Sequence, residues 1–110
     1  MKRIEKDNYV ILEDEKEDVK SFASFLDTTY DHIKNDNLVV DILKYGALSL
    51  EELLCFLKIS DKHRAEKKSF VIVNDTINID HVPDELVVVP TLQEAADVIQ
   101  MEEIERDMGF

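Results

Sequence analysis

The chain has 110 residues, of which 45% are hydrophobic and 35% charged, and its formal net charge is −12. This length suits a single domain with its own core. The excess of carboxylates argues against nucleic acid or an anionic membrane as partner, because binding either would bring like charges together. A basic protein surface, or simple solubility, fits the charge better. The N-terminus lacks the apolar core of a signal peptide and no apolar run could span a bilayer, so we expect a cytoplasmic protein.

Two short strands and a helix are expected in the first third of the chain. Strands around Ile4 and over residues 9–12 are joined by a turn at residues 6–8. Apolar residues then recur at helical spacing, which predicts a helix over residues 18–34 with one buried face. The residues of that face are Val19, Phe22, Phe25, Leu26, Tyr30 and Ile33.

A central strand and a long helix follow. Residues 38–43 are almost continuously apolar, as is typical of a strand buried on both faces, and Gly46 marks the loop after it. Ser49 stands at a helix N-cap position with Glu52 three residues later, which is the capping-box pattern. The helix is predicted to run to about residue 67 and to bury Cys55 as a small hydrophobic residue. Its last turns carry cations that suit a helix C-terminus: Lys62, His63, Arg64, Lys67 and Lys68.

The last third predicts two strands and a helix. Residues 70–73 and 86–89 read as strands, separated by an ordered loop with room for one turn of helix. Thr91 caps the final helix, with Glu94 in the capping-box position, and Gly109 closes it. Its expected buried residues are Leu92, Ala95, Ala96 and Ile99, with Ile104 as a further candidate.

The order of these elements predicts one α/β domain over residues 1–110. We expect a mixed sheet of four or five strands with helices mainly on one face. The right-handed crossover rule places the helix of residues 49–67 between two parallel strands.

Three segments resemble the STAS domain family, whose best-known members are bacterial anti-sigma factor antagonists. Residues 39–42 (Val-Val-Asp-Ile) match the apolar-Asp-Leu strand end of that family, and residues 70–74 (Phe-Val-Ile-Val-Asn) match its next strand. Residues 90–95 (Pro-Thr-Leu-Gln-Glu-Ala) match the start of its last helix. The resemblance covers nearly the whole chain. It implies the α/β fold just described and a regulatory role exercised by binding another protein.

The chain departs from that family at the switch region. Phospho-switched members carry Asp-Ser-Ser-Gly at the start of the helix after the central strand, where residues 49–52 here read Ser-Leu-Glu-Glu. Ser49 is the only hydroxyl nearby, and Glu51 and Glu52 would repel an incoming phosphate. We therefore prefer a capping role for Ser49 over phosphorylation. The segment after Asn74 is also shorter than the family's and lacks helical spacing.

Other chemistry finds little support in the sequence. The three histidines, His32, His63 and His81, lie on different elements without paired ligand spacing, and Gly46 and Gly109 cannot form a phosphate loop. We expect no metal, no cofactor and no catalytic residue. The alternative is an accessory or hydrolase-like protein that acts with an RNA-processing enzyme through His81 and neighbouring acids. A ribonuclease Z activity would need a His-x-His-x-Asp-His motif and a far longer chain, so we reject it.

The sequence therefore favours a non-enzymatic protein-interaction module whose partner is another protein, with a homodimer as a further option. In open α/β sheets, binding commonly occurs where strand ends meet helix N-termini. We expect a partner there, against Tyr45, Leu48, Ser49, Leu50, Glu51, Glu52, Ile77 and Ile79.

Overall fold

A five-stranded mixed sheet organises the chain. The computed structural model describes residues 1–15 and 17–109. The strands lie side by side in sequence order, the first antiparallel to the second and the others parallel. They are β1 (Lys2–Glu5), β2 (Val10–Glu13), β3 (Leu38–Asp41), β4 (Phe70–Val73) and β5 (Val87–Val89). The predicted α/β class, the opening hairpin and the parallel crossovers are confirmed.

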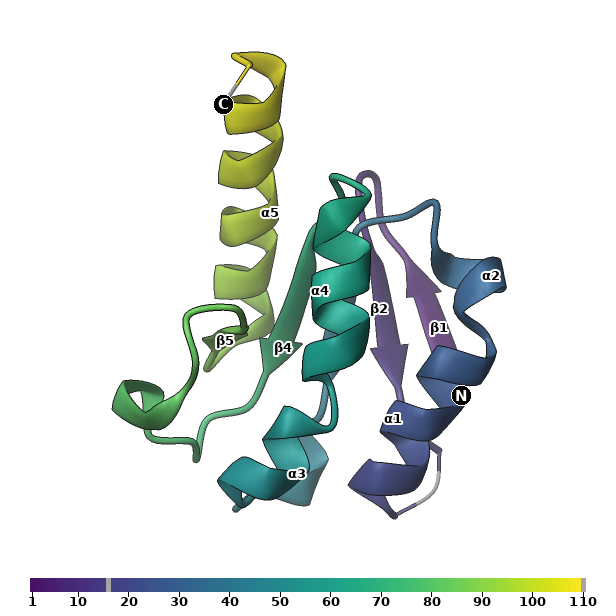
Figure 1. Cartoon of the computed structure of the whole chain (residues 1–110), viewed down its shortest axis with the longest axis vertical. Coiled ribbons are helices and arrows are strands. Elements are labelled where there is room, and N and C mark those ends of the chain that lie inside the picture. Colours follow the sequence, from purple (N-terminus) through teal and green to yellow (C-terminus); the bar gives the residue numbers. More distant parts are fainter. Residues whose placement is uncertain (16, 110) are drawn as a thin grey trace.

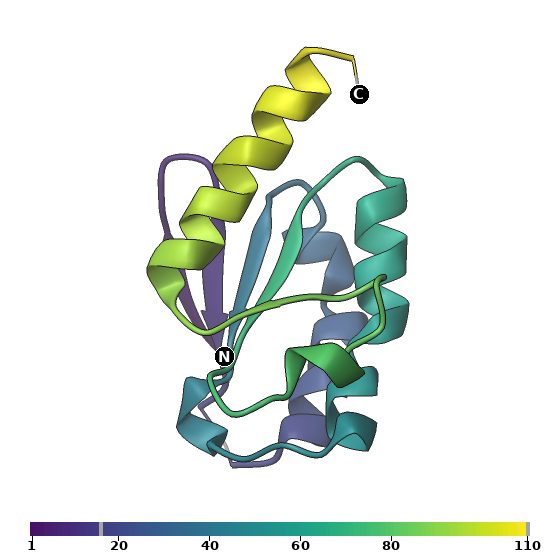
Figure 2. The ribbon, with the colours of Figure 1, turned by 90° about the vertical axis from the view of Figure 1, so that its left-hand side faces the viewer.

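Helices cover both faces of the sheet, unequally (Figures 1 and 2). Four pack on one face, where Leu38, Val40, Phe70 and Ile72 belong to the larger core. These are α1 (Val19–Thr28), α2 (Tyr30–Ile33), α3 (Leu50–Leu54) and α4 (Leu57–Ala65). The opposite face carries α5 (Leu92–Asp107), whose Ala95 and Ile99 join a smaller core with residues of β2, β3 and β4. Side chains alternate across a strand, so β3 and β4 feed both cores, as their continuous apolar runs predict.

The predicted helix over residues 18–34 is broken at Thr29, which corrects the sequence expectation. The hydroxyls of Thr28 and Thr29 bond back to the carbonyls of Ser24 and Phe25, each at 3.0 Å. The N–H of His32 then bonds to the carbonyl three residues earlier rather than four. Such back-bonding by threonine competes with the regular helical ladder. The chain therefore turns and starts α2 at a new angle.

The predicted helix over residues 49–67 is also two helices. Between α3 and α4, the N–H groups of Cys55 and Phe56 bond to carbonyls three residues earlier, which tightens the turn. The Phe56 ring then enters the core and meets Phe22 edge to face, at 6.4 Å between ring centroids. Cys55 is left exposed, so its predicted burial is wrong. The tightened turn has moved it off the buried face.

Strand ends are shorter than the apolar runs suggested. Asp41 accepts a bond from the N–H of Leu43 at 3.1 Å, which turns the chain into a 3-10 helix over Leu43–Tyr45. The fourth and fifth strands are joined by a loop with one 3-10 turn at Ile79–His81, as expected, and β5 begins at Val87 rather than Leu86.

The buried face of α5 was only partly predicted. Ala95 and Ile99 are fully buried, but Leu92 and Ile104 are exposed, and Ala96 is half-buried. The C-terminal half of α5 runs beyond the end of the sheet (Figure 2), so no strand lies under it there. Apolar residues keep their helical spacing along the whole of α5, but the sheet that would bury their side chains ends halfway along the helix. Within the described part of the chain, no helix combines the length and the apolar character that crossing a membrane requires.

Candidate functional site

The N-terminus of α3 forms at the carboxyl ends of the parallel strands, where a partner was predicted to bind. The Ser49 hydroxyl accepts a bond from the N–H of Glu52 at 3.1 Å. The Glu52 carboxylate accepts bonds from both the Ser49 N–H and the Ser49 hydroxyl, also at 3.1 Å. The predicted capping box is therefore complete. The Ser49 hydroxyl, which a phospho-switch would modify, is therefore engaged in hydrogen bonds within the capping box.

Asn74 ties the two loops at this edge together. Its side chain is buried at the end of β4, and its amide donates to the carbonyls of Ile42 and Gly46 at 3.3 and 3.0 Å. Its carbonyl oxygen accepts from the N–H of Thr76. The Thr76 hydroxyl, with one proton to donate, lies 2.7 Å from that oxygen and 2.6 Å from the Gly46 carbonyl oxygen. Gly46 has φ +63°, a conformation that favours glycine. These bonds hold the loop before α3 against the loop after β4.

Tyr45 anchors the same loop on its other side. Its hydroxyl bonds to the Asp14 carboxylate, and the Lys44 ammonium bonds to the Asp14 carbonyl. Burial raises the pKa of the Tyr45 hydroxyl, and the bond to Asp14 raises it further, because an ionised phenol would face a carboxylate. Tyr45 therefore acts here as a hydrogen-bond donor, and its ring is half-buried against the larger core.

The predicted binding residues divide into anchored and exposed groups. Tyr45, Leu48 and Ile77 are half-buried and pack on the larger core, so they support the loops more than they present a surface. Leu50 is 41% exposed, and Leu54, one helical turn further along α3, is 37% exposed. These two leucines lie on one side of α3, and we call them the α3 ridge. The side chain of Ile79 lies outside the described part of the chain.

The acidic residues have different roles. Glu52 is committed to the capping box, whereas Glu51 is exposed and pairs with Lys20 of α1 at 3.4 Å. Lys58 of α4 pairs with Asp27 of α1 at 3.7 Å. Exposed pairs of this kind contribute little to stability, but each of them joins the two sides of a groove.

This groove lies between α1 and the pair α3–α4, and no residue pattern predicted it. It has a volume of about 420 Å³ and is lined by Lys20, Ala23, Ser24, Asp27, Cys55, Lys58 and Ile59. The helical spacing predicted Cys55 in the core, so it did not indicate a groove lined by this residue. Only the break between α3 and α4 brings its thiol to this surface.

The residues of the hydrolase alternative lie on the loop after β4. Asp80 and His81 belong to the 3-10 turn and are exposed. Among the residues that the structure describes, no three His, Cys, Asp or Glu side chains are grouped to hold a metal ion.

Replacing Ser49 with alanine is expected to lower the free energy of unfolding by about 1 kcal/mol, because the N–H of Glu52 loses its acceptor. Ser49→Thr should restore most of this loss, since threonine also caps helices and keeps the hydroxyl that donates to Glu52. Urea denaturation followed by far-ultraviolet circular dichroism measures both changes.

The matched control is Ser24→Ala, an exposed serine inside α1, where the change should stay within about 0.5 kcal/mol. If Ser49→Ala proved as harmless as Ser24→Ala, the capping role would be wrong.

No family model matches this chain, and no curated protein matches it either. The resemblance to the STAS family therefore stays a prediction from the quoted segments.

Proposed function

We propose that this protein is a non-enzymatic regulatory module that binds another protein through the α3 ridge. The observation that carries the proposal is the exposure of Leu50 and Leu54 on a helix whose start is firmly held. Exposed apolar side chains grouped on one side of an anchored element favour association with a protein surface.

The anchoring matters for binding free energy. Association costs less when the binding residues are already ordered. The capping box fixes the first turn of α3, and the bonds of Asn74 and Tyr45 fix the loop that leads into it. The ridge is therefore presented in one arrangement, with the carboxylate of Glu51 beside it. A partner with an apolar depression and a basic rim would complement this surface.

The STAS-like fold and the lack of a phospho-switch belong to the same proposal. Support for the fold comes from the mixed sheet with α1–α4 on one face, the arrangement that the resemblance implies. Support for the second point comes from the Ser49 hydroxyl, which both donates and accepts within the capping box. Regulation would then depend on partner abundance or on competition rather than on modification of Ser49.

Capture from native lysate tests the proposal. Immobilised wild-type protein is compared with the variant Leu50→Gln/Leu54→Gln, and the bound proteins are quantified by mass spectrometry. At least one partner should be lost with this variant, and its affinity, measured with purified protein, should fall about tenfold or more.

The matched control is Met101→Gln/Ile104→Gln, which changes two apolar residues of α5 that are more exposed than Leu50 and Leu54. This control should retain the partner that the α3 variant loses. If every captured protein were retained by the α3 variant, or lost equally with both variants, the α3 ridge would not be the binding site.

A further inference from the structure

The outer side of α5 carries a row of apolar side chains that nothing covers within the described chain. Met101 is 63% exposed, Ile104 51% and Met108, directly after the helix, 65%. Their spacing of three and then four residues places them on one side of α5, and we call them the α5 stripe. It lies on the part of α5 that projects past the sheet (Figures 1 and 2).

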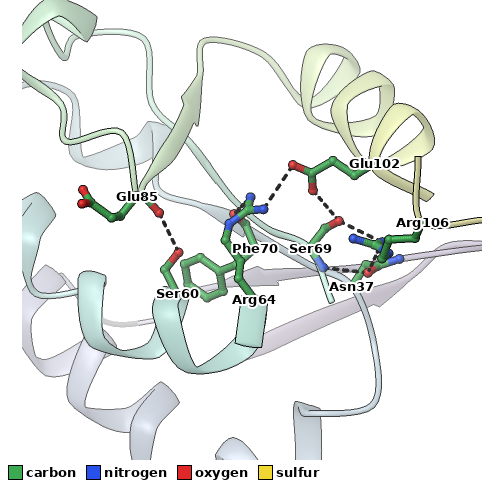
Figure 3. Close-up of polar contacts among 8 residues, drawn as sticks. All are labelled: Asn37, Ser60, Arg64, Ser69, Phe70, Glu85, Glu102 and Arg106. Atoms are coloured by element: carbon green, nitrogen blue, oxygen red, sulfur yellow. Dashed lines mark hydrogen bonds and ion pairs between the residues drawn. The ribbon is translucent and has the colours of Figure 1, made fainter. Parts of the chain in front are cut away.

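The inner side of the same half-helix is polar and firmly attached. Glu102 forms an ion pair with Arg64 of α4 at 3.1 Å and accepts a bond from the Ser69 hydroxyl at 2.6 Å (Figure 3). Arg106 donates to Ser69 at 3.2 Å and to Asn37 at 3.4 Å. These contacts fix the rotation of α5 about its axis. The α5 stripe is therefore held outward.

The charges of α5 are divided between these two sides. Arg106 is the only cation of the helix, and its bonds to Asn37 and Ser69 direct it inward. The exposed charges along α5 are all carboxylates: Glu94, Asp97, Glu105 and Asp107. An apolar row bordered by uniform negative charge favours a partner with an apolar row bordered by positive charge.

The spacing also indicates the form of that partner. With Met101 and Met108 at a positions and Ile104 at d, the stripe fits one heptad of a coiled-coil seam. Glu105 then stands at e and Asp107 at g, the positions whose charges select the partner helix. A second copy of this chain would set Glu105 against another carboxylate in an antiparallel pair and against Gln100 in a parallel pair, so neither orientation supplies a cation.

We propose that the α5 stripe is a docking site for a basic amphipathic helix of another protein, with apolar residues at its a and d positions and Lys or Arg at e and g. The site is separate from the α3 ridge and does not depend on the function proposed there.

The test uses a labelled peptide of three heptads with Leu at a and d and Lys at e and g. Its binding to the full chain is measured by fluorescence anisotropy at physiological salt, and its helix content by circular dichroism. The peptide should bind and gain helix. Met101→Gln/Ile104→Gln should weaken binding about tenfold or more, because the central contacts are lost. Leu50→Gln/Leu54→Gln should leave it unchanged.

Two control peptides distinguish the contribution of the apolar pattern to binding from the contribution of charge. One has Glu in place of Lys and should not bind; the other has the same composition with its apolar positions scrambled and should bind at least about tenfold more weakly. Equal binding of the scrambled peptide, equal loss in both protein variants, or no binding of the Lys peptide would overturn the proposal. So would sedimentation showing a wild-type dimer that Met101→Gln/Ile104→Gln dissociates, because the occupant would then be a second copy. If the α3 variant captured every protein that the wild type captures while the Lys peptide still bound at α5, only the proposed function would be disproved.

Discussion

Replacing Asn74 with aspartate is expected to lower the free energy of unfolding by about 3 kcal/mol, although the two side chains have nearly the same shape. The Asn74 amide donates two bonds, to the carbonyls of Ile42 and Gly46. Aspartate cannot donate them when ionised, and it would set a carboxylate against two carbonyl oxygens in a buried position. Urea denaturation followed by circular dichroism is the suitable measurement, because the chain has no tryptophan.

Asn78→Asp is the matched control for this change. Asn78 is exposed, and its side-chain oxygen accepts a bond from the N–H of Asp80 at 3.0 Å. An aspartate retains that acceptor, so the free energy of unfolding should change by less than about 0.5 kcal/mol. If both variants were equally stable, Asn74 would not be the residue that joins the loops before α3 and after β4.

Predicting the elements succeeded where one residue pattern determines the local structure. The continuous apolar runs of β3 and β4 identified buried parallel strands, and the Ser49–Glu52 pair identified the start of α3. In each case, the signal lies within a few neighbouring residues. The loops of the candidate site were placed correctly for the same reason, since they lie between such elements.

Predicting what each helix buries was less successful, because burial depends on distant parts of the chain. Helical periodicity continues through Thr29 and Cys55, but hydrogen bonds three residues apart break the helices there. Ile104 continues the apolar pattern of α5 but is exposed, because the C-terminal half of that helix runs past the end of the sheet. The exposure of Cys55 and of the α5 stripe could therefore not be derived from spacing alone.

The burial of His63 was also not predicted, because this residue lies in a segment of charged residues. The sequence grouped it with the cations at the end of α4, but its side chain is fully buried. Its Nε2 lies 2.7 Å from the Asp36 carbonyl and must donate, since that oxygen can only accept. Nδ1 then accepts from the Tyr30 hydroxyl at 2.9 Å. Burial lowers the pKa of His63, and the nearby cations Lys68 and Arg64 lower it further, against an opposing effect of Asp36.

We expect stability to fall as the pH drops below the ordinary histidine pKa of 6.5. The unfolded chain takes up a proton at His63 near that pH, whereas the folded chain takes it up only at lower pH. The free energy of unfolding should therefore be level above the unfolded pKa and decrease as the pH falls through the interval down to the folded pKa. Urea titrations from about pH 7.5 to about pH 5 follow the start of this decrease, in a range in which ordinary carboxylates remain ionised.

Replacing His63 with leucine should remove this pH dependence and lower the free energy of unfolding by about 3 kcal/mol at neutral pH, because the Tyr30 hydroxyl and the Asp36 carbonyl lose their partner. The double variant Tyr30→Phe/His63→Leu should recover part of that loss, since one unpaired buried group has been removed. His32→Gln, at an exposed histidine, should keep the wild-type profile. If His63→Leu kept the full decrease in stability between neutral and mildly acidic pH, His63 would not be its source.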